Sequence, residues 1–173
     1  MTVAAAEAWT AADAENFASL FRAQPGGVAV ITADDGRGPV ALTATSVSSV
    51  SVAPPMLVLT ASDRSSASPT IIAAETLVVH FLDVDDVDIA RLAATSGADR
   101  FADPRRWSRL PGGEPIYDAV ARKVRVRTVE RVRAGGATVL IAEALDVHAA
   151  SVHGHPLVYH DRAWRDLGGG YVI

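Results

Sequence analysis

Two runs of residues in the last third of the chain, 123–133 and 137–149, limit the fold more than any other feature. Both are rich in β-branched and apolar residues, and only a short segment with two glycines, Ala134-Gly135-Gly136, separates them. If the two runs pair as antiparallel strands with residue 133 opposite residue 137, Arg127 lies opposite Glu143 and Val129 lies opposite Ile141. The first is a pair of opposite charges and the second an apolar pair. The sequence therefore predicts a long β-hairpin and, with it, an antiparallel sheet.

Shorter periodic runs predict the remaining elements. We expect strands at residues 28–32, 56–61, 77–82 and 157–160, with a further strand from residue 39 onward, and helices at residues 14–23, 70–75 and 85–95. The first helix should pack on the sheet, and residues 97–113 should be irregular. Many strands and few short helices indicate a mainly β fold, a closed or nearly closed antiparallel barrel. Because a small barrel has little room inside, we expect a ligand on its outer wall, between subunits.

Composition sets the outer bounds. The 173 residues, 49% of them hydrophobic, can bury one sizeable core, so we expect a flexible N-terminal end at residues 1–12 and a single domain at residues 13–173. We see no membrane span and no signal peptide, so a cytoplasmic protein without membrane contact is expected. The lack of cysteine excludes disulfides, thiolate metal sites and thiol nucleophiles. The net charge of −4 gives no reason to expect nucleic acid as a partner.

The stretch from Thr43 to Ser51 carries a hydroxyl on all but three of its residues. It is expected to form one strand with hydroxyls on both faces: Thr43, Thr45, Ser49 and Ser51 on one, and Ser46 and Ser48 on the other. Short hydroxyl side chains leave the main chain accessible and offer both donors and acceptors, which suits a phosphorylated ligand. An edge strand that simply faces solvent shows the same pattern, so the residues alone leave both interpretations open.

Several segments together resemble one known family. They are Pro25-Gly26-Gly27-Val28-Ala29-Val30, the hydroxyl stretch, Pro54-Pro55, Asp63-Arg64-Ser65-Ser66, Arg100-Phe101 and Pro156-Leu157-Val158-Tyr159. Their order and spacing, across residues 17–167, are similar to the flavin reductase-like family, which includes the small reductase components of two-component flavin monooxygenases. The resemblance implies an antiparallel split β-barrel of the FMN-binding type and a homodimer with the flavin, FMN or FAD, near the subunit interface. It also implies reduction of the flavin by NADH or NADPH.

The resemblance also assigns residues to a cofactor site. The flavin-binding set is Thr43, Ala44, Thr45, Ser46, Val47, Ser48, Ser49, Val50 and Ser51 along the ring and ribityl chain, Thr60, then Asp63, Ser65 and Ser66 at the ribityl and phosphate groups, and Arg100 and Phe101 on a loop over the flavin. The nicotinamide set is Gly26, Gly27, Tyr159 and His160. No catalytic side chain is nominated, because the cofactors perform the hydride transfer.

Simpler roles compete with several of these assignments. Arg100 could form a surface ion pair with Asp99 or Asp103, and Phe101 could be a packing residue. The basic residues Lys123, Arg125 and Arg127 fit a solvated strand face better than a binding surface. We expect no metal site, because His153, His155 and His160 surround a turn and have neither cysteine nor a clear carboxylate ligand beside them.

One position departs from the family's pattern. Many of these reductases carry Gly-Asp-His at a turn linked to nicotinamide binding, where this chain has Gly135-Gly136-Ala137. The function expected from the resemblance is an NAD(P)H-dependent flavin reductase that supplies reduced FMN or FAD to a separate monooxygenase. The alternatives are a flavin-binding protein without nicotinamide-dependent activity, and a split barrel for another ligand such as haem or a deazaflavin.

Overall fold

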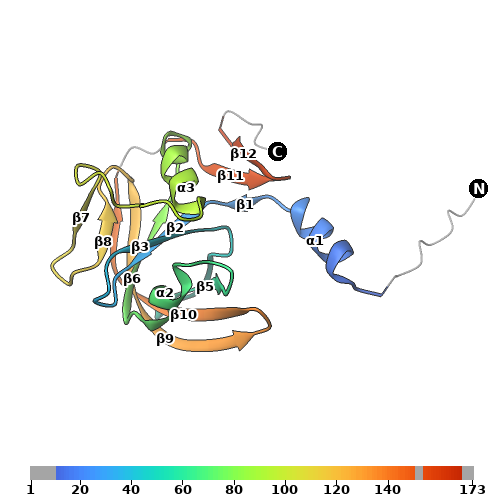
Figure 1. Cartoon of the computed structure of the whole chain (residues 1–173), viewed down its shortest axis with the longest axis horizontal. Coiled ribbons are helices and arrows are strands. Elements are labelled where there is room, and N and C mark those ends of the chain that lie inside the picture. The colour runs from blue at the N-terminus through green and yellow to red at the C-terminus, as the bar shows by residue number, and fades with distance from the viewer. Residues whose placement is uncertain (1–10, 151–153, 169–173) are drawn as a thin grey trace, which may run out of the picture.

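The computed structural model describes residues 11–150 and 154–168. A seven-stranded antiparallel sheet forms the body of the molecule, in the order β3-β2-β6-β9-β10-β5-β4 (Figure 1). Its strands are β2 (Ala29–Ala33), β3 (Val40–Ala44), β4 (Ser48–Val52), β5 (Pro55–Ser62), β6 (Thr76–Phe81), β9 (Arg122–Ala134) and β10 (Ala137–Ala149). The long hairpin predicted from the sequence is β9 and β10, and it lies in the middle of this sheet.

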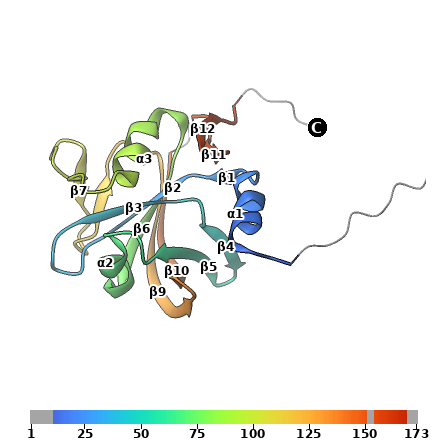
Figure 2. The ribbon, with the colours of Figure 1, turned by 45° about the vertical axis from the view of Figure 1, so that its right-hand side comes forward.

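The sheet is curled into a split barrel, as its strand order requires. Strands β3 and β4 are its two outer edges, yet only Thr45–Val47 link them in the chain. Such a link spans at most about 14 Å, so the two edges must lie close together. Figure 2 shows β3 running on into β4 beside β5. No pairing joins β3 to β4 in the described part of the chain, so the barrel wall has a break, called the seam below.

Two apolar clusters fill the two sides of the curled sheet. The first joins the sheet to helix α2 (Ser68–Ala73) and includes the fully buried side chains of Ile31, Leu59 and Ile71. The second joins β2 to helix α3 (Val87–Ala94), which follows the short 3-10 helix η1 (Val84–Asp86). Burying these side chains gives the fold most of its favourable free energy. Both helices were predicted from the sequence, and each lies within two residues of its predicted position.

Smaller strands extend the barrel at its ends. Strands β1 (Gly26–Gly27), β11 (Leu157–His160) and β12 (Ala163–Asp166) form a separate three-stranded sheet. Strands β7 (Trp107–Arg109) and β8 (Pro115–Tyr117) form a two-stranded arm. The arm corrects the expectation that residues 97–113 are irregular throughout.

The register of the long hairpin differs from the predicted one near its turn. Ala134 pairs with Ala137, so Gly135 and Gly136 form a two-residue loop. The register then shifts by one residue at a β-bulge, which brings Arg127 opposite Glu143 as predicted. Because the bulge lies at Val129, the predicted pairing of that residue with Ile141 is wrong.

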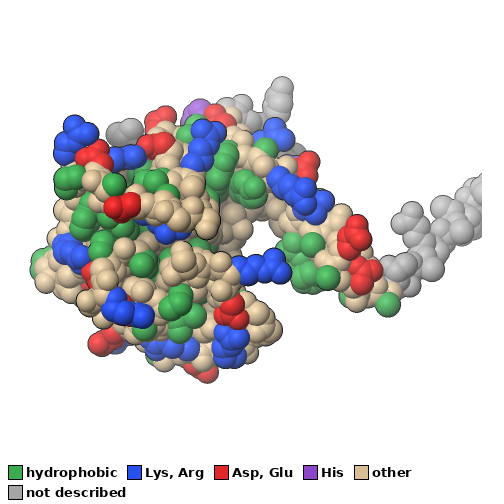
Figure 3. Space-filling view, in the orientation of Figure 1, with side chains coloured by type: hydrophobic (Ala, Val, Ile, Leu, Met, Phe, Trp, Pro, Cys, Tyr) green, Lys and Arg blue, Asp and Glu red, His purple; other side chains and the backbone are tan. Residues whose placement is uncertain are grey.

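Helix α1 (Ala14–Arg22) forms as predicted but does not pack on the sheet. Asp13 caps its first turn, and none of its residues is buried. The apolar side chains Phe17, Leu20 and Phe21 are 57%, 69% and 60% exposed. In Figures 1 and 3 the helix, with its hydrophobic side chains, stands off the body of the molecule. The segment after it, β1, pairs with β11 of the small sheet and not with the seven-stranded sheet.

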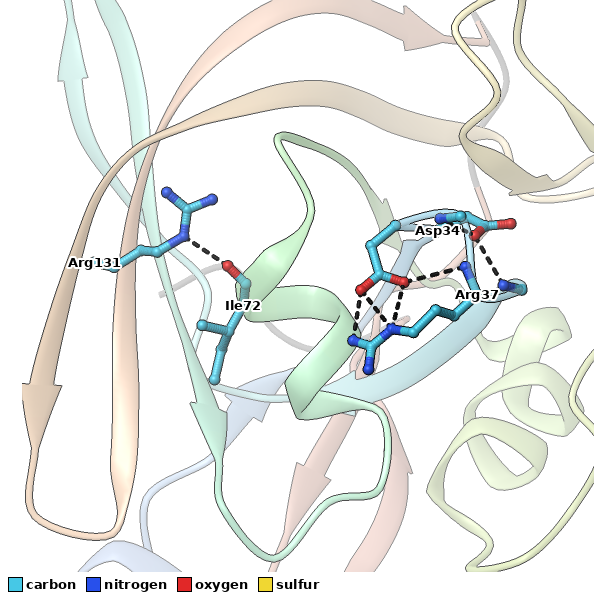
Figure 4. Close-up of polar contacts among 7 residues, drawn as sticks. Asp34, Arg37, Ile72 and Arg131 are labelled. Carbon is cyan, nitrogen blue, oxygen red and sulfur yellow. Dashed lines mark hydrogen bonds and ion pairs between the residues drawn. The ribbon is translucent and has the colours of Figure 1, made fainter.

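Polar contacts hold the turns and the short helix in place (Figure 4). At the β2–β3 turn the Asp34 carboxylate accepts hydrogen bonds from the main-chain N–H groups of Gly36 and Gly38. Arg131 of β9 donates to the carbonyl oxygens of Ile72 and Ala74 at the end of α2. Carbonyls at a helix C-terminus have no partner within the helix, so this arginine satisfies them.

Within the described residues, every helix is too short or too polar to cross a bilayer.

Candidate functional site

Two adjoining cavities lie along the seam of the barrel and share Thr43 and Ala94. The first has a volume of about 290 Å³ and is lined by Leu42, Thr43, Ser62, Arg64, Ser65, Ser66, Ala93, Ala94, Ser96 and Arg100. The second has a volume of about 260 Å³ and is lined by Thr43, Ala44, Thr45, Ala94, Tyr159 and Trp164. Together they have the size of a typical small-molecule site, which is roughly 300 to 1,000 Å³.

The first cavity has the donor set of an anion site. Its lining includes two guanidinium groups and five hydroxyls, and no carboxylate. Guanidinium N–H groups match the geometry of phosphate oxygens, and hydroxyls can donate to the oxygens that remain. We therefore call it the phosphate cavity.

Arg100 is held at the edge of the phosphate cavity by two carbonyl groups. Its Nε donates to the carbonyl oxygen of Ala93 at 3.1 Å and its Nη2 to that of Thr95 at 3.0 Å. Both carbonyls lie at the C-terminal end of α3, where a cation is favoured. A guanidinium has five N–H donors, so donors remain for a ligand. The alternative of a surface ion pair with Asp99 or Asp103 is not what the structure shows. Asp103 pairs with Arg105, and Asp99 accepts a hydrogen bond from the main-chain N–H of Phe101.

The loop at Ser62–Ser66 forms the opposite wall and is tied to the rest of the fold. Ser68 Oγ donates to the carbonyl oxygen of Ser62 at 2.6 Å, and Ser65 N–H donates to the same oxygen at 3.0 Å. Asp63 forms a two-point ion pair with Arg133, at 2.7 and 2.9 Å, and these hydrogen bonds hold the pKa of its carboxyl below the ordinary value. Asp63 therefore anchors the loop to β9 and does not line the cavity.

The second cavity is apolar and aromatic, so we call it the ring cavity. Tyr159 and Trp164 face each other across the β11–β12 hairpin, with ring centroids 4.8 Å apart. Gly26 packs against Thr45, which lines this cavity: a Cβ placed on Gly26 would lie 2.9 Å from Thr45 Cβ. A planar ring system joined to a phosphate group matches the two adjoining cavities: the ring fits the ring cavity and the phosphate fits the phosphate cavity.

The structure places some of the predicted flavin-binding and nicotinamide-binding residues in the cavity linings and the others outside them. Those that line a cavity are Thr43, Ala44, Thr45, Ser65, Ser66 and Arg100, with Tyr159 from the nicotinamide set. Those outside both linings are Ser46, Val47, Ser48, Ser49, Val50, Ser51, Thr60, Asp63 and Phe101, with Gly26, Gly27 and His160 from the nicotinamide set.

The hydroxyl stretch is two strands, not one. Strand β3 ends at Ala44 and β4 begins at Ser48, and each pairs with a different neighbour, β2 and β5. The predicted common faces across Thr43–Ser51 are therefore wrong, because the chain crosses the seam in the middle of the stretch. The outer edge of β4 is unpaired in the described part of the chain, and most of its residues are exposed.

Phe101 is a packing residue, the simpler of its two interpretations. It is 9% exposed and lies in the second apolar cluster. Its ring stacks on Tyr117 with centroids 5.5 Å apart and meets the edge of Trp107 at 4.9 Å. It therefore anchors the loop that carries Arg100.

Several cavity residues were not predicted. They are Leu42, Ser62, Arg64, Ala93, Ala94, Ser96 and Trp164. Arg64 belongs to the motif that carried the family resemblance, so its side chain could have been included. Trp164 could have been found from the two-residue turn at Asp161-Arg162, which places it opposite Tyr159. Ser96 has no signal in the sequence.

The basic strand residues and the histidines have local partners. Arg125 pairs with Glu114 and Asp146, and Arg127 pairs with Glu143. His155 lies 3.2 Å from the Asp166 carboxylate, and His160 Nε2 lies 3.1 Å from the carbonyl oxygen of Ala23. His153 lies outside the described residues. Within residues 11–150 and 154–168, no group of three or more side chains is arranged to hold a metal ion.

Comparisons with known proteins agree with this fold. A family model described as "Flavin reductase like domain" matches residues 21–168. An NADH:FMN oxidoreductase from Rhodococcus qingshengii is 36% identical over 151 residues, 86% of this chain and 79% of that protein. The reductase subunit of stachydrine N-demethylase from Rhizobium meliloti is 32% identical over 78% of this chain and 58% of its own length. The crystal structure of a flavin reductase domain protein from Arthrobacter sp. FB24 has a TM-score of 0.84 at 29% identity, covering 92% of this chain and 99% of that one. This chain belongs to the flavin reductase-like family.

Proposed function

We propose that this protein is an NADH-dependent flavin reductase whose flavin is FMN. The observation that carries the proposal is the pair of adjoining cavities, one aromatic and one lined by Arg64 and Arg100 without any carboxylate. The name of the Rhodococcus relative, NADH:FMN oxidoreductase, supports both the reductant and the flavin.

The protein's part in the reaction is to bind and orient. Arg64 and Arg100, with the hydroxyls around them, would hold the phosphate group of FMN, and Tyr159 and Trp164 would hold its ring. The flavin supplies the hydride-accepting chemistry when it is bound. Neither cavity lining contains an Asp, Glu, His or Lys, so the described residues place no strong acid or base at the ring. Its contribution is therefore geometric, through alignment of the two ring systems.

A separate oxygenase receives the reduced flavin in this proposal. The relative from Rhizobium meliloti is named as the reductase subunit of a demethylase, which supports a division of labour between two proteins. The ring cavity is partly open to solvent, and Thr45 in its lining is exposed. An open site suits a flavin that is released after reduction.

The functional form is a homodimer, in which a second copy of the chain covers the apolar face of α1. A nine-residue helix is marginal in water by itself, and this one buries none of its residues within its own chain. Light scattering should give the mass of a dimer for the wild type and a monomer for Leu20→Asp. The control Ser19→Asp, on a neighbouring exposed position, should remain a dimer. A monomeric wild type would refute this part of the proposal.

An enzymatic assay tests the reductase proposal. The purified protein is mixed with FMN or FAD, and the absorbance of NADH and of NADPH is followed separately. The proposal predicts fastest turnover with FMN and NADH. A protein that binds FMN, detected by a flavin-dependent rise in melting temperature, but consumes neither nucleotide would contradict it.

One observation favours a second candidate, a flavin-binding protein without nicotinamide-dependent activity. The Asp63 N–H donates to the carbonyl oxygen of Gly136, so the hairpin turn lies beside the Ser62–Ser66 loop. At this turn Gly135-Gly136-Ala137 offers neither an imidazole nor a carboxylate. Flavin binding without nucleotide consumption in the assay above is the outcome this candidate predicts.

A further inference from the structure

Tyr117, which the sequence did not single out, is bonded to the main chain of the arginine in the phosphate cavity. Its hydroxyl donates to the carbonyl oxygen of Arg100 at 2.9 Å. The tyrosine lies on β8 and is only 1% exposed, so this hydrogen bond is shielded from competing water. Burial raises the pKa of the hydroxyl to about 12, so it remains a donor at neutral pH.

Tyr117 is itself fixed by the barrel. Its main-chain N–H donates to Nε2 of His80 at 3.1 Å, while Nδ1 of the same imidazole lies 3.0 Å from the carbonyl oxygen of Val30. The two contacts are compatible with a neutral ring that donates from Nδ1 and accepts at Nε2. Burial keeps His80 neutral by lowering its pKa to about 3. A continuous path of hydrogen bonds therefore runs from β2 through β6 and β8 to Arg100.

Arg100 is thus fixed at two separate points. Its guanidinium is bonded to the end of α3, and its main chain is bonded to Tyr117. The first contact sets the direction of the side chain, and the second sets the position of its Cα relative to the barrel. Together they restrict a side chain that otherwise has many rotamers, in a cavity that Arg100 shares with the Ser62–Ser66 loop.

We propose that Tyr117 is a positioning residue for the phosphate cavity, which makes the site selective for a phosphorylated flavin over riboflavin by holding Arg100 in place. The inference rests on the proposed function. It predicts that the hydroxyl of Tyr117 affects binding of the phosphate group only and has no effect on binding of the flavin ring.

The test compares dissociation constants for FMN and for riboflavin by fluorescence titration. Tyr117→Phe retains the stacking on Phe101 and removes only the bond to Arg100, so the Kd for FMN should rise about fivefold, the range for loss of one hydrogen bond. The Kd for riboflavin should change less than about twofold. The control Ser108→Ala removes a hydrogen bond to Asp118 from the same arm and should leave both constants unchanged.

A double-mutant cycle separates positioning from a general structural effect. Arg100→Ala should raise the Kd for FMN more than Tyr117→Phe does, and Tyr117→Phe in the Arg100→Ala background should have no further effect on the ratio of the two constants. Equal losses of FMN and riboflavin affinity in Tyr117→Phe, or additive effects in the cycle, would overturn the inference. Failure of the wild type to bind either flavin would instead overturn the proposed function.

Discussion

Acid should destabilise this protein through one buried imidazole. His80 is fully buried, and desolvation lowers its pKa from 6.5 to about 3. In the unfolded chain the same imidazole takes up a proton near its ordinary pKa. Between these two values the unfolded state therefore binds more protons than the folded state, so stability decreases as the pH falls.

The loss of unfolding free energy can be calculated from the lowered pKa of His80. Each pH unit below the unfolded pKa removes about 1.4 kcal/mol, so lowering the pH from about 7 to about 5 should cost about 2 kcal/mol from His80 alone. Urea denaturation of the wild type and of His80→Gln at both pH values measures this contribution. The glutamine amide can donate and accept but does not titrate, so the variant should lose about 2 kcal/mol less than the wild type over the same interval.

The comparison uses the difference between two pH values, so a general loss of stability in His80→Gln does not affect the conclusion. Protein concentration is held fixed, because any dimer makes apparent stability depend on it. Carboxyl groups titrate in both proteins and cancel in the difference. If wild type and variant lose the same free energy between the two pH values, the imidazole is not responsible for the acid sensitivity.

Two pairs of glycine substitutions provide further predictions. Gly26→Ala places a Cβ 2.9 Å from Thr45 Cβ and should raise the Kd for FMN several-fold in a titration, whereas Gly27→Ala, with nothing within 4 Å, should leave it unchanged; equal constants for the two variants would argue against the ring cavity. Gly135→Ala, at a φ of +58°, should lose about 1 kcal/mol of unfolding free energy by chemical denaturation, while Gly136→Ala should lose less. Equal losses would show that the loop conformation is not strained.

The regular parts of the fold were predictable because local pattern and tertiary environment agree. Strands β9 and β10 combine β-branched residues with a two-glycine turn, so the hairpin was visible in the sequence. The predicted register was wrong near the turn because of a bulge at Val129, which nothing in the local sequence marks. Helix α1 was found from its periodicity, but periodicity cannot show which surface covers an apolar face.

The candidate site was predicted in part, from the resemblance to the family. Thr43, Ser65 and Arg100 belong to motifs that resemble the family, and the structure places all three at the cavities. Ser48 and Ser49 were included because the whole hydroxyl stretch resembles the family's flavin-binding segment and was expected to form one strand. The break between β3 and β4 arises from closure of the barrel, a long-range property.

The break in the barrel wall has a mechanical consequence. Among the described residues, β3 and β4 each have a single neighbour in the sheet, so their outward amides have no ladder partner there. These amides should exchange with deuterium before those of β9 and β10. Thr43 at the end of β3, Ser62 at the end of β5 and Ala94 of α3 all line the phosphate cavity. A ligand bound there would contact β3, β5 and α3 at once and so would hold the two sides of the seam together. Ligand binding should therefore slow hydrogen exchange at the edges of β3 and β4.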